Sequence, residues 1–294
     1  MSEQIKTQEL IEENRRDELS EQEKAFTAQY LSQELAELTG GAQLIVNPMR
    51  ALGAKDSGHD VFFIQSGKDS QVQRGPTFAC KRFRQIDSAE KELNSLGLAK
   101  NRGFVTIEPA GEGIFSISNI GHFLVTKHMS RLNTMNYLGW RNFYVGDEKY
   151  ASNAAEPLQR IGRFAAQLHS AGVTHGDLQV KNIGQNSRGD FVLFDLENAI
   201  FWDEDKLDED LDFLGNAAED IGMIIKSLIK RGFLWSSTEK IFAEEVQGQL
   251  LDPYLDSITI SNPDIIDYIA PKLDIAHLRS LLHSDFASRI GLPS

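Results

Sequence analysis

Hydrophobic and polar positions alternate differently in the two halves of the chain. In the N-terminal half, short apolar runs at 42–46, 60–65 and 77–83 are separated by Gly-containing turns, which predicts β-strands. Residues 123–126 predict another short strand, and residues 88–98 have a helical pattern. After about residue 132 helical patterns dominate. The pattern therefore predicts an α+β fold with a strand-rich N-terminal half and a helical C-terminal half.

Two amphipathic helices are expected in the C-terminal half. The first has Pro157 near its start, and its apolar positions are Leu158, Ile161, Phe164, Ala165 and Leu168. The second is stopped by Gly232, and its apolar positions are Ile221, Ile224, Ile225, Leu228 and Ile229. Between these helices, residues 191–195 predict a short strand after a turn at 186–190.

The N-terminal segment, residues 1–39, contains neither Gly nor Pro and is rich in acids. Ser20 and Glu23 have the spacing of a capping box, which predicts the start of a helix. One helical stripe is expected to hold Phe26, Tyr30, Leu35 and Leu38. We expect a helix docked on the remainder of the chain, with a dedicated partner-binding arm as the alternative.

Composition and charge narrow the class of protein. The chain has 294 residues, a formal net charge of −13 and a single cysteine, Cys80, so it forms no internal disulfide. The excess of acids disfavours nucleic acid and anionic lipid as partners and suits a cationic substrate. No apolar run is long enough for a membrane span, and the first residues lack a signal-peptide pattern. A cytoplasmic protein is expected.

The candidate chemistry is concentrated in residues 168–198. This stretch presents Asp177, Asn182 and Asp195, three polar residues suited to phosphoryl transfer. In that reaction one carboxylate orients the attacking hydroxyl and accepts its proton, while an amide and a second carboxylate hold magnesium on the phosphates.

Four segments, in order, resemble the protein-kinase-like superfamily. Residues 175–178 (His-Gly-Asp-Leu), followed by Asn182, resemble the catalytic loop H-x-D-L-x-x-x-N. Residues 195–197 (Asp-Leu-Glu) fall where the metal-binding D-F-G tripeptide would lie, and residues 78–81 (Phe-Ala-Cys-Lys) resemble V-A-I-K. Asp220 resembles the helix aspartate that braces the catalytic-loop backbone. The resemblance covers about residues 42–230 and implies a two-lobed fold.

The resemblance also implies roles for individual residues. Asp177 would be the catalytic carboxylate, while Asn182 and Asp195 would bind Mg²⁺. Lys81 would reach the phosphates of ATP, and Ala79, on the same strand face, would lie against adenine. His175 is expected to position the loop rather than to react.

Three assignments leave alternatives open. The ion-pair partner of Lys81 is expected to be Glu92, with Glu90 as the alternative. Lys181 would approach the transferring phosphate, because position 179 is Gln where a lysine is usual; the alternative is a solvent-facing lysine. A phosphate-binding loop resembling that of RIO-type kinases would use Gly53, Lys55, Ser57 and Gly58, and a plain hairpin turn is the alternative.

Two departures from the family pattern bear on the substrate. Leu196 and Glu197 replace the Phe-Gly of D-F-G, a form similar to choline-type and other small-molecule kinases. Only 25 positions separate Asp195 from Asp220, without an A-P-E tripeptide, as in RIO-type kinases, lipopolysaccharide-core kinases and aminoglycoside phosphotransferases. The acidic run 203–212 lies in this gap and predicts a solvated loop, with a docking surface for a cationic substrate as the alternative.

The expected organisation is a helical extension (1–39), a sheet-containing N-lobe (40–129) and a helical C-lobe with the catalytic loop (130–294). The expected function is transfer of the γ-phosphate of ATP to a hydroxyl with Mg²⁺. The short segment 133–157 favours an atypical Ser/Thr protein kinase over a small-molecule kinase acting on an amino-alcohol, aminoglycoside or sugar. A pseudokinase binding module is disfavoured because Lys81, Asp177, Asn182 and Asp195 are all present. The acceptor would be a protein or a cationic small molecule.

Overall fold

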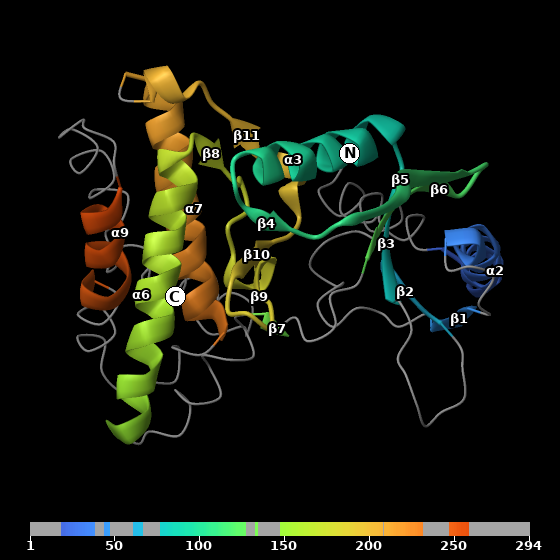
Figure 1. Ribbon diagram of the computed structural model, residues 1–294, viewed down its shortest axis with the longest axis horizontal. Helices are drawn as coiled ribbons and strands as arrows, with labels where there is room; N and C mark the ends of the chain where they lie inside the picture. Colours follow the sequence, from blue (N-terminus) through green and yellow to red (C-terminus); the bar gives the residue numbers. More distant parts are fainter. Residues whose placement is uncertain are drawn as a thin grey trace, which may run out of the picture. The chain divides into compact units, whose positions relative to one another are not determined.

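The computed structural model has the predicted α+β architecture (Figure 1). It describes residues 19–38, 44–47, 61–66, 77–127, 133–134, 148–207, 209–231 and 247–258. The chain divides into two compact units. The first unit comprises residues 1–94 and 107–130, and the second comprises residues 95–106 and 131–294.

The first unit is built on a five-stranded antiparallel sheet with the order β1-β2-β3-β6-β5. Its strands are β1 (Leu44–Asn47), β2 (Val61–Ser66), β3 (Thr77–Phe83), β5 (Pro109–Ile117) and β6 (Gly121–Lys127). The four predicted strands of this half are confirmed as β1, β2, β3 and β6. Strand β5 was not predicted, because Pro109 and the positive-φ glycines Gly111 and Gly113 interrupt its apolar alternation.

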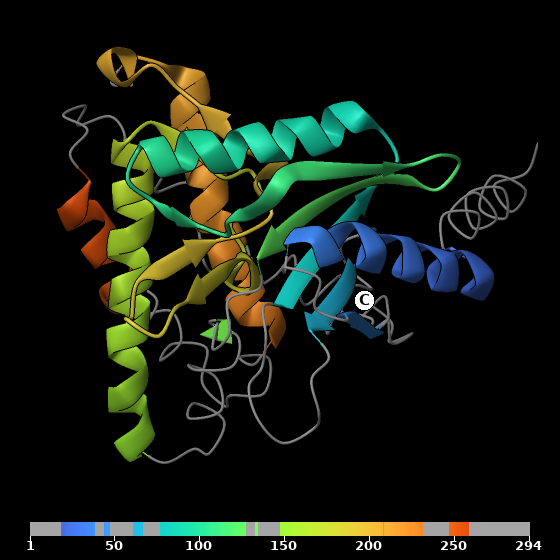
Figure 2. The ribbon, with the colours of Figure 1, turned by 45° about the vertical axis from the view of Figure 1, so that its right-hand side comes forward.

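Helix α2 (Glu21–Leu38) lies against this sheet (Figure 2). Its capping box is confirmed: the Ser20 N–H donates to Glu23 Oε2 at 2.8 Å, and the Glu23 N–H donates to Ser20 Oγ at 3.3 Å. Leu31 and Leu35 join the core formed with strand residues such as Phe62 and Ile64.

The predicted apolar stripe of α2 is wrong in part. Phe26 and Leu38 are 54% and 48% exposed, and Thr27, Ala28, Leu31 and Leu35 form the buried face instead. Phe26 precedes Leu31 by five residues, which turns a helix by about 140° beyond one full turn and so moves Phe26 off the buried face.

Helix α3 (Ile86–Asn101) is continuous between the two units: residues to Asn94 belong to the first and residues from Ser95 to the second. It is longer at both ends than the predicted 88–98. Just after it, the Arg102 guanidinium donates to the carbonyls of Ala171, Gly172 (2.7 Å) and Trp202 (2.7 Å), all within the second unit. The Arg102 side chain therefore joins the turn at residues 171–172 to the chain at Trp202.

Helices α6 (Glu148–Ser170), α7 (Leu211–Arg231) and α9 (Asp252–Ser257) form the bulk of the described second unit. The short π-helix η5 (Gln247–Leu251) and α9 pack against α6 (Figure 1). A small sheet has the strand order β4 (Val105–Thr106), β10 (Phe191–Leu193), β9 (Ile183–Gln185) and β7 (Asn133–Thr134). Strands β8 (Val173–Thr174) and β11 (Ile200–Phe201) pair separately.

Both helices of this unit begin well before the apolar positions from which they were predicted. Pro157 lies inside α6, which begins at Glu148, because the apolar periodicity used to place the start begins only at Leu158. Helix α7 begins at Leu211, within the acidic run, where the Asp210 carboxylate accepts the N–H groups of Asp212 and Phe213 at 3.0 Å each. Gly232, the predicted stop, lies outside the described residues.

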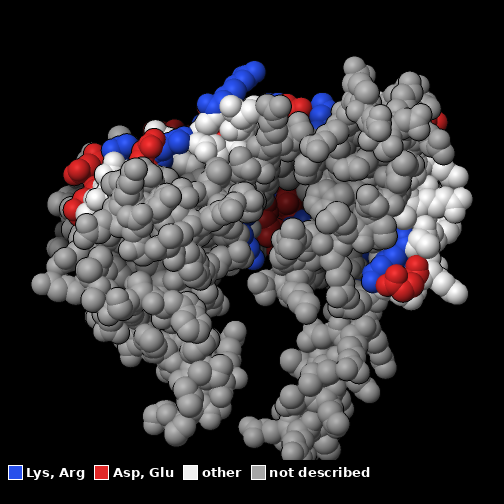
Figure 3. All heavy atoms as spheres, turned by 90° about the horizontal axis from the view of Figure 1, so that it is seen from below, with Lys and Arg blue, Asp and Glu red and all other residues white. Residues whose placement is uncertain are grey.

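Charged side chains of the described residues lie intermingled on the face shown in Figure 3, with acids and bases next to one another. In the described part of the chain, no helix has both the length and the apolar character to cross a membrane.

Candidate active site

Strand β3 and helix α3 bring a lysine and a glutamate together in the first unit. Lys81 Nζ lies 2.7 Å from Glu92 Oε2, and the Glu92 residue is only 1% exposed. Glu90 is exposed, so Glu92 is the partner, as the sequence predicted. The ammonium group of Lys81 also lies 4.9 Å from the centroid of the Phe83 ring, two positions along the same strand face.

The residue before this lysine points to the opposite face of the strand. Cys80 is fully buried in the core of the first unit, and burial raises the pKa of its thiol well above the usual range. The alternation of β3 therefore separates an inert core thiol from the charged Lys81.

The predicted catalytic loop follows strand β8 in the second unit and turns at Gly176. This glycine has φ +75°, and a Cβ atom added to it would lie 2.6 Å from the Asn198 carbonyl oxygen. Only glycine fits this turn without strain. The His-Gly-Asp order therefore has a steric reason.

The carboxylate of Asp177 is held by two side-chain amides. Asn182 Nδ2 donates to Asp177 Oδ2 at 3.0 Å and to the Asp177 carbonyl at 2.9 Å. Gln179 Nε2 donates to Asp177 Oδ1 at 2.5 Å. Neutral amide donors orient a carboxylate without removing its negative charge, so this arrangement suits a group that must accept a proton.

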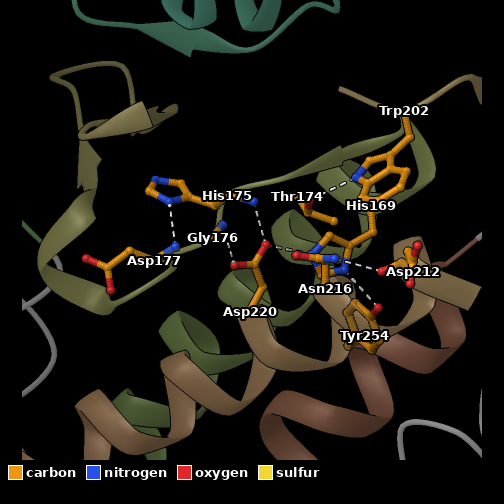
Figure 4. A network of polar contacts seen from close by, with 10 residues as sticks. All are labelled: His169, Thr174, His175, Gly176, Asp177, Trp202, Asp212, Asn216, Asp220 and Tyr254. Atoms are coloured by element: carbon orange, nitrogen blue, oxygen red, sulfur yellow. Dashed lines mark hydrogen bonds and ion pairs between the residues drawn. The ribbon is translucent and has the colours of Figure 1, made fainter. Parts of the chain in front are cut away.

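His175 ties the loop to the strand that precedes Asp195. Its Nδ1 accepts the Asp177 N–H at 3.3 Å, so Nε2 carries the hydrogen that is donated to the Phe194 carbonyl at 2.8 Å. Figure 4 shows the ring of His175 beside the backbone of Asp177. This buried geometry fits the positioning role expected for His175.

Helix α7 braces the loop at two points. Asp220 is fully buried, and its two oxygens accept the N–H groups of His175 at 2.6 Å and Gly176 at 2.9 Å (Figure 4). Two turns along the helix, Ser227 Oγ accepts the Val180 N–H at 3.1 Å. The bracing expected of Asp220 is present in the structure, whereas the contribution of Ser227 was not predicted.

The two residues expected to bind magnesium lie at one end of the β9–β10 hairpin. Leu193 pairs with Ile183, and the Phe194 N–H donates to the Asn182 carbonyl at 3.1 Å. Asp195 follows in the left-handed conformation (φ 58°), which turns the chain into the 3₁₀ helix η2 (Leu196–Asn198).

The donor set of this hairpin end fits a hard cation. Because Asn182 Nδ2 donates to Asp177, its Oδ1 faces away from that residue. An amide oxygen and a carboxylate are ligand types that Mg²⁺ takes.

Several predicted features have other outcomes. Outside the described residues lie the predicted phosphate-binding loop, with Gly53, Lys55, Ser57 and Gly58, and one member of the acidic run, Asp208. Lys181 is half-buried in the 3₁₀ helix η1 (Val180–Asn182), immediately before the Asn182 side chain.

The acidic run is partly engaged in local structure. Asp203 caps the 3₁₀ helix η3 (Glu204–Lys206) by accepting the Asp205 N–H, and it pairs with Lys206 at 3.1 Å. The hydrogen bond from Lys206 is the main cause that lowers the pKa of Asp203. Glu204 lies 3.7 Å from Arg102. These contacts and the Asp210 cap of α7 favour a structural over a docking role for these members of the run.

Besides Ser227, sequence reasoning missed three residues around the loop. Gln179 was recognised only as the replacement of a lysine, although it contacts Asp177 directly. His169 contacts Asp220, and Tyr254 contacts His169 by a hydrogen bond that joins α6 to α9. A second histidine six residues before His175 was a usable sequence signal for His169, whereas no local pattern marks Tyr254.

Comparison with known proteins extends the resemblance. The model of the lipopolysaccharide kinase (Kdo/WaaP) family matches residues 116–226, a span that contains Asp177, Asn182, Asp195 and Asp220. No curated protein sequence matches the chain. A solved structure, WaaP in complex with acyl carrier protein, is similar with a TM-score of 0.46 and 16% identity, covering 85% of this chain and 90% of that one.

The family match covers the whole catalytic-loop region, and the loop has the ordered geometry described above. The chain is an atypical protein-kinase-like enzyme, an ATP-dependent phosphotransferase. The preference for a Ser/Thr protein kinase is not borne out by the comparisons.

Proposed function

We propose that this enzyme uses ATP and Mg²⁺ to phosphorylate a hydroxyl group of a sugar, in an acceptor of the lipopolysaccharide-core type. The observation that carries the proposal is the lipopolysaccharide kinase match at residues 116–226, because it spans the complete set of loop and hairpin residues. From this match we propose for the chain the kind of acceptor that the family's name gives, a lipopolysaccharide.

Asp177 is the proposed catalytic base. Its carboxylate orients the attacking sugar hydroxyl and takes its proton as the bond to phosphorus forms. The amides of Asn182 and Gln179 keep both oxygens of Asp177 in place. Such fixed geometry lowers the entropic cost of bringing the hydroxyl and the phosphate together.

Magnesium and phosphate are assigned to separate groups of residues. Asn182 and Asp195 would hold Mg²⁺, which neutralises charge on the phosphates when bound. Lys81 would contact phosphate oxygens, and the buried Glu92 fixes the direction of its ammonium group. Lys181 is proposed to supply a second positive charge near the transferring phosphate.

A short connection after the proposed metal-binding segment fits an acceptor that is not a peptide. Between Asp195 and Asp220 the described chain forms η2, β11 and η3 and then enters α7 at Leu211. Ordinary protein kinases position a peptide with an activation segment that ends in A-P-E, a tripeptide that is absent between Asp195 and Asp220. The compact secondary structure found at this point suits an acceptor that does not need such a platform.

The test is transfer of label from [γ-³²P]ATP with Mg²⁺ to four acceptors offered separately. These are lipopolysaccharide, its isolated core oligosaccharide, a basic protein and an amine-bearing small molecule. We expect label in the first two. Label confined to the protein or the amine would overturn the sugar assignment while leaving the kinase assignment intact.

Asp177→Asn is the matching variant for the chemistry. It keeps the size of the side chain but replaces one carboxylate oxygen by an NH₂ group, so it loses one of the two amide contacts and cannot accept a proton. We expect kcat to fall by about 10²–10⁴-fold while ATP binding persists. The control is Asp190→Asn, in the exposed turn where Asp190 contacts only Asn186 among the hydrogen bonds described. Normal turnover in a folded Asp177→Asn protein would refute the assignment of the base.

A further inference from the structure

A buried chain of polar contacts runs beneath the catalytic loop from three different helices. Tyr254 in α9, His169 in α6 and Asp220 in α7 are each fully or almost fully buried. His169 Nδ1 lies 2.9 Å from the Tyr254 hydroxyl, and His169 Nε2 lies 3.4 Å from Asp220 Oδ2. Figure 4 shows the three side chains in sequence, ending at the loop backbone.

The chemistry of these groups fixes the direction of each hydrogen bond. The Asp220 carboxylate accepts the N–H groups of His175 and Gly176, so the His169 nitrogen that faces it acts as a donor. If Nε2 carries the hydrogen of the neutral ring, Nδ1 is an acceptor, and the Tyr254 hydroxyl must donate to it. Burial, and then the negative charge of Asp220, raise the pKa of Tyr254 well above its usual range, so this donor persists across working pH.

We propose that Tyr254 is a positioning residue of the catalytic loop: its hydroxyl holds His169 as the Nε2–H tautomer, and His169 thereby orients the Asp220 carboxylate that fixes the loop amides before Asp177. These contacts connect the catalytic loop to helix α9, which lies well downstream in the sequence. Their effect on turnover rests on the proposed function, whereas the tautomer and the amide contacts do not.

The tautomer of His169 can be measured without any substrate. Imidazole ¹⁵N chemical shifts of the full chain should report His169 as the Nε2–H tautomer. An Nδ1–H tautomer or a doubly protonated ring would overturn the proposal, because Tyr254 would then have to accept rather than donate. This measurement on the unaltered protein decides the donor order even if the variants fold poorly.

Tyr254→Phe removes only the hydroxyl group. We expect amide hydrogen exchange at His175 and Gly176 to become about tenfold faster, the effect of one lost hydrogen bond in the support of these amides. The matched control is Gln249→Met, because the 2.6 Å bond between Gln159 and Gln249 also joins α6 to the C-terminal segment without reaching the loop. Unchanged exchange in Tyr254→Phe, or an equal acceleration in both variants, would overturn the positioning role.

A second variant tests whether the effect passes through the histidine. His169→Gln keeps an amide donor close to the position of Nε2 and does not need Tyr254 to select its tautomer. Tyr254→Phe should therefore add less than a twofold acceleration in the His169→Gln background, against about tenfold in the unaltered chain. An equal acceleration in both backgrounds would mean that Tyr254 acts by another route.

Turnover provides the catalytic readout. With the acceptor identified in the labelling test, Tyr254→Phe should lower kcat about tenfold while the KM for ATP stays within twofold, because the loop amides, rather than the nucleotide contacts, are disturbed. Unchanged kcat with faster loop exchange would refute the catalytic consequence and leave the proposed sugar-kinase function standing. If the unaltered chain transfers no label to any of the four acceptors, the proposed function is refuted instead.

Discussion

Replacing Glu92 by Gln should destabilise the first unit by about 3 kcal/mol. Glu92 has a side chain only 2% exposed, and its partner Lys81 has one 16% exposed. Removing one member of a buried pair takes away the nearest opposite charge of the other and costs about 3–5 kcal/mol. The lower end applies here because Lys81 retains some contact with water and the amide of Gln can still accept a hydrogen bond from it.

The single cysteine provides a local probe of this unit. Cys80 adjoins Lys81 on β3, is fully buried and has a thiol whose pKa burial raises, so it should react only when the sheet opens. With a urea m-value of about 1.5–3 kcal/mol per M, the midpoint of Cys80 labelling should fall by about 1–2 M in Glu92→Gln.

Glu90→Gln is the matched control, because it makes the same change on an exposed position of the same helix. It should shift the unfolding free energy by no more than about 0.5 kcal/mol. A Lys81→Met, Glu92→Leu double variant should recover much of the loss, since neither charge is then buried alone. Equal midpoints for Glu92→Gln and Glu90→Gln, or full additivity in the double variant, would refute the reasoning.

Two further changes test the second unit. ATP at a hundredfold excess over its Kd should stabilise the native protein by about 2.7 kcal/mol. Asp195→Asn replaces an anionic oxygen ligand by a neutral one, so the part of this stabilisation that depends on magnesium should largely disappear. If calorimetry shows an unchanged response to magnesium in the variant, Asp195 is not a metal ligand. Gly176→Ala should destabilise the protein by about 2–4 kcal/mol in urea unfolding, because φ is +75° and the new Cβ would meet the Asn198 carbonyl. Gly222→Ala, in α7 with nothing near the new Cβ, should be neutral or stabilising, and equal losses in both variants would contradict the steric argument.

The sequence alone determined the features that depend on neighbouring residues. The capping box of α2 joins Ser20 and Glu23 within one helical turn, and the alternation of β3 places Cys80 and Lys81 on opposite faces. Such features follow from backbone periods of 2 and 3.6 residues, so a linear pattern is sufficient to predict them.

The tertiary structure decided the features that depend on residues far apart in the chain. The pattern of α3 left both Glu90 and Glu92 possible, and packing against β3 buried only Glu92. The exposure of Phe26 and Leu38 likewise depends on which face of α2 meets the sheet. The hydrogen bonds between His175 and Asp220 and between His169 and Tyr254 join residues 45 and 85 positions apart. No local period links such positions, because they meet only when the helices that carry them pack around a common core.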